Sequence, residues 1–233
     1  MSTRTERPAG SRLRRIARAA AEPPPPPVAA EERCELCGEP IPPEHRHLID
    51  VESRALLCAC RACQILFDRR EAGGSHYRLV PERRRRVEDF ELDDAAWAEL
   101  RIPVEMAFFF HSTAAERVVA FYPSPMGATE SLLELDAWEQ LVGANPVLES
   151  LEPDVEALLV NRARGARDCF VVPVDDCYRL VGLIRTEWRG LTGGQEVWQE
   201  IERFFAELAE RAEPVSRTGQ EVTWQTSGSA SQT

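Results

Sequence analysis

The chain contains no lysine, so all 28 of its basic residues are arginines, and asparagine occurs only at positions 145 and 161. This bias is typical of a GC-rich genome, so an arginine cluster alone indicates little about function. Apolar runs of about 20 residues, the length of a membrane span, are absent, which excludes a transmembrane protein. The N-terminal segment has no apolar stretch of the secretory type, so we expect a cytoplasmic location.

The charge balance is acidic, because 39 acidic residues outweigh 28 basic ones and give a formal net charge of −11. This charge argues against a general nucleic-acid or membrane-surface binder, since such proteins usually present a net basic face. The length of 233 residues suits one ordinary domain with a small module. We find no phosphate loop, nucleophile motif or paired-carboxylate signature, so the sequence leans away from an enzyme.

Composition divides the chain into four segments. Residues 1–30 are basic and end in five consecutive prolines and a short apolar stretch, which predicts a disordered tail with a stiff spacer. Residues 31–72 hold five of the seven cysteines and predict a metal-binding module. Residues 73–213 predict a mixed α+β domain, and residues 214–233 a second disordered tail. The expected fold class is therefore α+β with a small metal module in front.

Aromatic and β-branched runs predict antiparallel hairpins in the larger domain, and apolar residues at helical spacing predict the C-terminal helices that follow. The runs 106–112 and 117–122 predict one hairpin, and 156–162 with 169–174 a second, although 155–161 also suits a helix. Residues 76–80 predict a further strand. The expected helices are 93–100, 135–144, 175 or 176 to 188, and 195–212, with Asp93 or Asp94, Asp136, and Asp175 or Asp176 as their caps.

Two cysteine pairs of equal spacing carry the clearest chemical signal. Cys34 and Cys37 form a Cys-x-x-Cys knuckle followed by Gly38, and Cys60 and Cys63 repeat that spacing after residues 38–59. Such a pair turns two thiolates toward one ion, and two pairs at this separation predict a tetrahedral four-thiolate site. A segment this short rarely folds on its own apolar surface, so the metal would supply much of its folding energy.

Three neighbouring side chains leave the ligand set open. Cys58 could replace Cys60 as a ligand, or it could remain a spare thiol near the site. His45 or His47 could also enter and give a site of three cysteines and one histidine, although both also fit exposed positions on a loop. The equal spacing favours Cys34, Cys37, Cys60 and Cys63.

Four thiolates suit either zinc or iron. Rubredoxin-type iron sites have a tight turn at both pairs, whereas here the second pair runs into residues 64–67, which resemble the start of a helix. A knuckle, a hairpin and a helix whose first turn supplies two ligands make up a treble-clef zinc module, and a zinc ribbon is the related alternative. We therefore expect zinc, with rubredoxin-like iron as the alternative.

The module also resembles the zinc-bearing HNH nucleases in its two cysteine pairs and in His47. That family adds Asn or His residues that position a divalent metal, but here Gln64 follows the last cysteine and the next histidine is His76. Without these groups the module has no residues to position the divalent metal that phosphodiester cleavage requires, so we do not expect an active nuclease. This resemblance implies at most a degenerate, nucleic-acid-binding relative, which the acidic charge disfavours.

Residues from about 33 to 212 are similar to an uncharacterised actinobacterial family, a domain of unknown function. The similarity lies in residues 34–38, 57–63, 121–125, 127–131, 158–162, 178–185 and 188–190. Genes of that family lie beside those of a nickel–iron hydrogenase and an iron–sulfur scaffold-like protein. The resemblance thus implies a non-enzymatic accessory protein with hydrogenase subunits or maturation factors as partners, and it supplies no catalytic residues.

Two remaining features have structural interpretations. The four consecutive arginines at 83–86 are expected on a solvated surface near a helix, with a docking patch for an acidic protein or phosphate as the alternative. Cys169 and Cys177 flank a strand-to-helix junction and are expected to be buried structural thiols.

Overall fold

The computed structural model describes residues 31–68, 76–190 and 192–222. The predicted tail at 1–30 and the last part of the second tail, 223–233, lie outside the described residues. Residues 33–233 group as one unit and residues 1–32 as another. The architecture below is that of residues 33–222.

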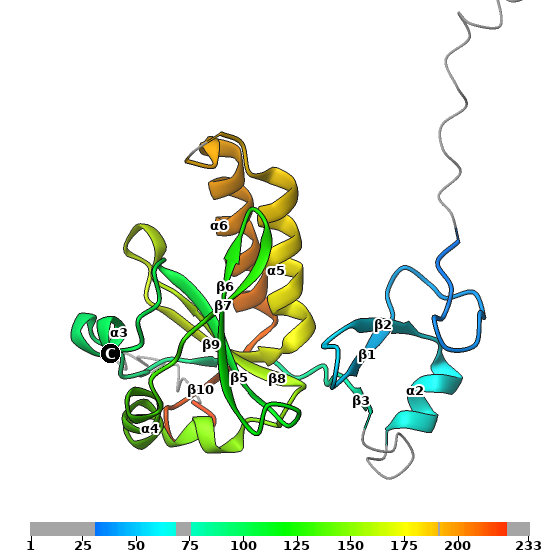
Figure 1. Ribbon diagram of the computed structural model, residues 1–233, viewed down its shortest axis with the longest axis horizontal. Helices are drawn as coiled ribbons and strands as arrows, with labels where there is room; N and C mark the ends of the chain where they lie inside the picture. Colours follow the sequence, from blue (N-terminus) through cyan, green and yellow to red (C-terminus); the bar gives the residue numbers. More distant parts are fainter. Residues whose placement is uncertain (1–30, 69–75, 191, 223–233) are drawn as a thin grey trace, which may run out of the picture. The chain divides into compact units, whose positions relative to one another are not determined.

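A three-stranded antiparallel sheet follows the first cysteine pair, with the strand order β2-β1-β3. Its strands are β1 (Arg46–Asp50), β2 (Leu56–Ala59) and β3 (Tyr77–Leu79), and helix α2 (Arg61–Phe67) begins directly after β2 (Figure 1). Leu48 and Ala59 are fully buried beside the cysteines and form a small core. The knuckle, hairpin and helix therefore occur in the predicted treble-clef order, and β3, beyond the expected boundary at residue 72, completes the sheet.

A seven-stranded sheet forms the larger part, in the order β10-β4-β9-β8-β5-β6-β7. Neighbouring strands are antiparallel except for the parallel pair of β10 and β4. The strands are β4 (Arg85–Val87), β5 (Met106–Ser112), β6 (Arg117–Ser124), β7 (Gly127–Ser131), β8 (Glu156–Asn161), β9 (Asp168–Pro173) and β10 (Glu213–Val215). Both predicted hairpins are confirmed, and 156–161 forms strand β8 rather than part of the alternative helix at 155–161.

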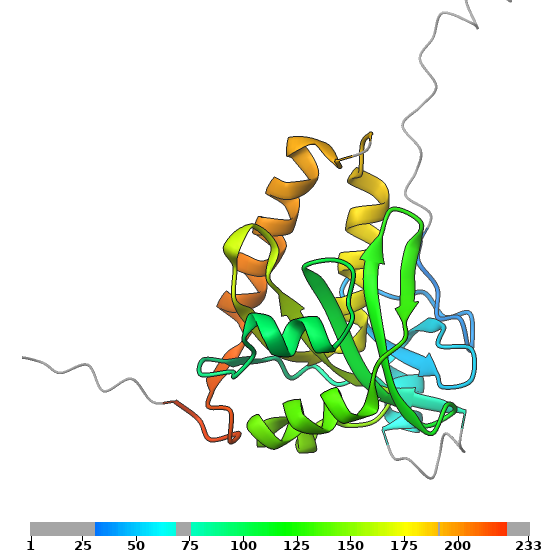
Figure 2. The same cartoon turned by 60° about the vertical axis from the view of Figure 1, so that its left-hand side comes forward.

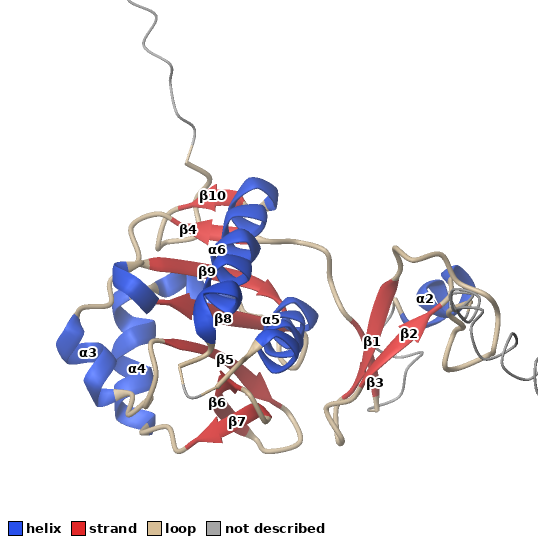
Figure 3. Cartoon of the chain, turned by 90° about the horizontal axis from the view of Figure 1, so that it is seen from above, coloured by secondary structure: helices blue, strands red, loops and turns tan. Residues whose placement is uncertain are grey.

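Helices cover both faces of this sheet (Figure 3). Helices α5 (Val174–Glu187) and α6 (Gly194–Arg211) lie side by side on one face, as the two views in Figures 1 and 2 agree. On the other face lie α3 (Asp94–Glu99), α4 (Leu135–Ala144) and the 3-10 turn η1 (Pro146–Ser150), while a second 3-10 turn, η2 (Ala163–Gly165), joins β8 to β9. The central strands are therefore buried on both sides.

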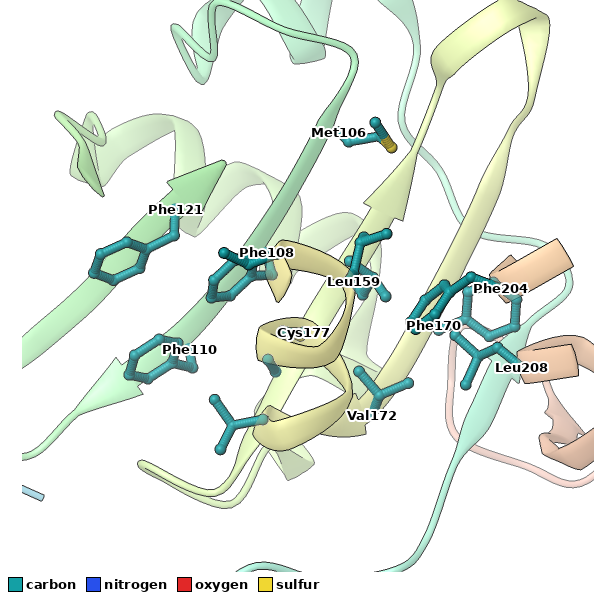
Figure 4. Close-up of a cluster of buried hydrophobic side chains, with 14 of the residues drawn as sticks. Met106, Phe108, Phe110, Phe121, Leu159, Phe170, Val172, Cys177, Phe204 and Leu208 are labelled. Atoms are coloured by element: carbon teal, nitrogen blue, oxygen red, sulfur yellow. The ribbon is translucent and has the colours of Figure 1, made fainter. Parts of the chain in front are cut away.

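Alternation along the strands sorts the aromatic residues between two cores. Phe108 and Phe110 of β5 point toward α5 and α6, whereas Phe109 between them points to the opposite core and stacks on Trp138. Figure 4 shows the first core, where Phe108 and Phe110 lie near Phe121 and the side chains of β8, β9 and α5. Burying each phenylalanine contributes about 1.5–3 kcal/mol to the stability of the fold. Because both faces of β5 are buried, its apolar run is continuous rather than alternating.

The helices lie where the sequence predicted them, but only one of the predicted N-caps is correct. The apolar stripe of α6 is buried as expected from its helical spacing. Asp93 is a true N-cap, since its carboxylate accepts a hydrogen bond from the Ala96 amide. The expected caps of α4 and α5 are wrong: these helices have Glu134 and Pro173 at the N-cap, so the aspartates lie in the first turn. Carboxylates are stabilised there by the helix dipole without capping it.

The arginine run 83–86 is only in part the solvated, helix-adjacent surface that we expected, because strand β4 incorporates its last two residues. Arg85 is 7 % exposed and contacts the Glu156 carboxylate at 3.5 Å and the Ser150 hydroxyl at 2.9 Å. Glu156 is 1 % exposed and also accepts a bond from Arg83. A strand alternates its side chains between two faces, so Arg85 is buried while the next side chain, Arg86, is 41 % exposed. Arg84, just before the strand, pairs with Asp176 of α5 and is 14 % exposed.

The C-terminal boundary also differs from the expected one at residue 213. Pro214 and Val215 belong to β10, which pairs with Arg86 and Val87 of β4. Proline is tolerated there because β10 is an edge strand. None of the helices in the described part of the chain has the length and apolar composition needed to cross a membrane.

Candidate metal centre

The four cysteines of the two pairs converge. Cys34 and Cys37 lie in the turn before the small sheet, Cys60 is the N-cap of α2 and Cys63 lies in the first turn of that helix. Their four sulfur atoms all lie within 4.8 Å of one another, and the Cys37 and Cys60 sulfurs are 3.5 Å apart. The fold thus brings together the four cysteines that the sequence spacing predicted as one cluster.

Local hydrogen bonds fix the shape of the first pair. The Gly38 amide donates to the Cys34 carbonyl at 2.8 Å, and the Cys34 amide donates to the Glu39 carbonyl at 2.8 Å. Gly38 has a φ of 78°, a value that a side chain would disfavour, so the glycine is needed for its backbone conformation. Glu35 then ties this turn to β2, because its amide donates to the Cys58 carbonyl and its carboxylate accepts from the Cys58 amide.

The second pair owes its position to the start of a helix. Cys60 has extended backbone angles, φ −69° and ψ 163°, so the chain leaves β2 and turns into α2 at this residue. The Gln64 amide donates to the Cys60 carbonyl at 2.9 Å, and the Gln64 side chain donates to the Ala59 carbonyl at 2.8 Å. Thiolates at a helix N-terminus face its exposed amides and positive dipole end, which stabilise negative charge.

The cluster is electrostatically suited to a cation. Burial is the largest influence on Cys34 and raises its pKa, but hydrogen bonds from the Cys60, Cys37 and Leu36 backbone outweigh it and lower the pKa to about 6. Burial, with the neighbouring sulfurs of the cluster, raises the pKa of Cys63 to about 12. One thiolate therefore forms readily, and further thiolates need a positive ion among them.

The donor set fits a metal ion on these grounds. Cys34 and Cys60 are buried at 2 % and 7 % exposure, Cys63 is 9 % exposed, and only Cys37 is open to solvent. Four sulfur ligands around one point match the closed tetrahedral arrangement of structural zinc sites, and iron accepts the same ligands. The cluster is thus a possible metal site whose ligands allow either metal.

The three side chains that left the ligand set open form a separate group. Cys58 lies on β2 directly opposite His47 of β1, and these two residues with His45 bring one ligand atom each within 4.8 Å of one another. Neither histidine lies in the four-cysteine group. The HNH resemblance receives no support from α2, whose sequence RACQILF offers no histidine or asparagine.

One residue that the sequence assigned only to helix capping belongs beside this group. Asp175, in the first turn of α5, has its Oδ2 atom 3.0 Å from Nδ1 of His47. The two residues are 128 positions apart, so no local pattern could have paired them. The remaining cysteines, Cys169 and Cys177, are buried in the larger part as expected.

The fold and this site define a class: an α+β protein with a treble-clef-like module whose four cysteines form a possible metal centre. The family model for DUF5947, a family of unknown function, matches residues 33–212. The chain belongs to that family. No curated protein and no solved structure matches it.

Proposed function

We propose that the protein is a non-enzymatic accessory factor that binds zinc through Cys34, Cys37, Cys60 and Cys63 and acts by contacting another protein. The observation that carries the proposal is the convergence of four sulfurs within 4.8 Å at a knuckle and a helix start. A zinc ion there supplies folding energy of about 10–16 kcal/mol to a module with little core of its own. Its role is structural, since all four positions are taken by cysteine.

Zinc rather than rubredoxin-like iron is favoured by the second pair. Cys60 and Cys63 begin the seven-residue helix α2 instead of forming a second knuckle. The treble-clef arrangement with two ligands from a helix start is a zinc arrangement, whereas rubredoxin-type sites carry a turn at both pairs. The zinc-loaded module then presents a fixed surface.

Helix α2 supports the interaction role. Ile65 and Leu66 follow the last ligand and are 65 % and 57 % exposed. Adjacent large apolar side chains on a surface indicate a contact site more often than scattered ones do. The metal would hold this helix in place, so that binding of the ion and binding of the partner are linked.

The partner that we propose is part of the nickel–iron hydrogenase machinery, either a subunit or a maturation factor. The support for this partner is the family resemblance described from residues 33–212 and the gene neighbourhood of that family. We propose a cytoplasmic location on the same basis.

The metal is tested by elemental analysis of the full-length, freshly reduced protein, made without a metal supplement. We expect zinc and no iron, with Cys37→Ser losing the metal of the four-cysteine site. Cys169→Ala is the matched control, because Cys169 is a buried cysteine of the large sheet. A red protein with stoichiometric iron would overturn the zinc assignment, and a four-cysteine site without any metal would overturn the proposal.

The partner is tested in the native host. A tagged full-length chain should co-purify hydrogenase subunits or maturation factors, and the Cys37→Ser variant should not. Deletion of the gene should impair hydrogen oxidation. If neither hydrogenase proteins nor a change in hydrogen oxidation is found, the hydrogenase role is refuted while the zinc site still stands or falls on its own measurement.

A further inference from the structure

We propose that His45, His47 and Cys58 form a second metal site, for a divalent ion of the zinc class, with Asp175 positioning one of its histidines. The site shares no residue with the four-cysteine centre, so the proposal of this site does not depend on the proposed function. Two imidazoles and one thiolate are ligands that zinc prefers.

The hairpin of β1 and β2 places the three ligands on one face. His47 and Cys58 are directly opposed in the antiparallel register, where side chains of a pair come within reach of each other. His45 precedes His47 by two positions, and residues two apart in an extended chain point to the same side. One ligand atom from each residue lies within 4.8 Å of the others, and the two imidazole centroids are 5.0 Å apart.

Hydrogen bonds orient both imidazoles in the same way. Nδ1 of His47 lies 3.0 Å from the Asp175 carboxylate, and Nδ1 of His45 lies 2.9 Å from the Pro42 carbonyl. Both partners are acceptors, so we assign a proton to Nδ1 of each ring, which leaves Nε2 of each as the ligand atom. A ligating histidine that donates its other nitrogen to a carboxylate or a carbonyl is the usual arrangement around protein-bound metals.

Asp175 supplies the charge behind the site. Its Oδ2 atom faces His47, while Oδ1 is buried and has no hydrogen-bond partner among the described residues. A buried carboxylate oxygen without a donor is costly unless positive charge lies nearby. A divalent ion bound through His47 provides that charge, and the Cys58 thiolate with the Asp175 carboxylate balances it.

The coordination differs in kind from that of the four-cysteine centre. Three protein ligands leave one tetrahedral position for water or an external donor, as in zinc sites that bind a further ligand. Cys58 is also tied to the first centre through the Glu35 backbone and side chain. The two sites therefore lie on the same hairpin and share its backbone, but each has its own donors.

The test is zinc stoichiometry of the full-length reduced chain, measured by titration against a chromophoric chelator. The parent should bind two equivalents, while His45→Ala and His47→Ala should each bind one. Cys169→Ala is the matched control, because this buried cysteine of the large sheet belongs to neither metal site and the variant should keep both equivalents. Asp175→Asn should keep both equivalents and weaken one of them about 10–100-fold.

Cobalt substitution separates ligand loss from misfolding. In the Co²⁺ form, His45→Ala should alter the d–d bands assigned to the second ion, and the four-thiolate charge-transfer bands should remain. His45 is the milder change, since it precedes β1 and is only partly buried. A parent that binds one equivalent, or histidine variants that still bind two with unchanged spectra, would overturn the second site.

Discussion

His47 on β1 of the small sheet and Asp175 in the first turn of α5 lie 3.0 Å apart between Nδ1 and Oδ2. The adjacent Asp176 is also engaged, since its carboxylate accepts from Arg84 at 2.5 Å. On the apolar side, Ile49 and Val51 of the small sheet region belong to the same core cluster as α5 and α6. The cysteine-bearing hairpin is thus joined to the larger core by both polar and apolar contacts.

The first prediction concerns removal of the metal. Chelation should speed amide hydrogen exchange in residues 34–67, because this segment loses the ion that organises its small core. Strands β5, β8 and β9 should keep their protection, since two large apolar clusters bury them without any of the four cysteines of the metal centre. Exchange measured by mass spectrometry checks this. Equal loss of protection in both regions would contradict it.

The second prediction concerns the buried ion pair of the large sheet. Arg85→Met should lower the free energy of unfolding by about 3–5 kcal/mol, because it leaves the Glu156 carboxylate buried with a weaker set of partners. Arg101→Met is the control, since Arg101 and its partner Glu134 are 70 % and 53 % exposed and exposed pairs contribute about 1 kcal/mol or less. Urea unfolding measures both, and equal effects would contradict the burial argument.

The third prediction concerns thiol reactivity. Burial, followed by the Asp168 charge, raises the pKa of Cys169 to about 12, and burial raises the pKa of Cys177 well above its usual value. The reactive thiolate is therefore almost absent at pH 8. Iodoacetamide at that pH should leave both residues unlabelled in the native protein and label both after unfolding, as peptide mapping would show. Native labelling at the rate of a free cysteine would refute this.

The fourth prediction concerns the apolar surface of α2. Ile65→Glu should abolish co-purification of the partner while the zinc content stays unchanged, because a charge replaces an exposed apolar contact without touching a ligand. Met126→Glu is the matched control, since Met126 is 94 % exposed at the β6–β7 turn. If both variants retain the partner, the contact lies elsewhere on the molecule.

Elements whose signal is local could be predicted from the amino-acid order alone. A Cys-x-x-Cys spacing acts within one turn, so residue spacing was enough to recognise the two pairs and Gly38. The same holds for the apolar stripe of α6, because the period of 3.6 residues is set by helix geometry. It also holds for the aromatic and β-branched runs of the β5–β6 hairpin, because these residue types favour strands.

Features that depend on contacts between distant segments emerged only from the folded chain. The burial of Arg85 follows from the position of β4 between β9 and β10, and no property of four consecutive arginines indicates it. Asp175 could be recognised only as a helix-start residue, and its approach to His47 arises when α5 packs near the small sheet. His47 and Asp175 are 128 positions apart. The chain topology decides that they meet, and the spacing of residues along the sequence does not reveal it.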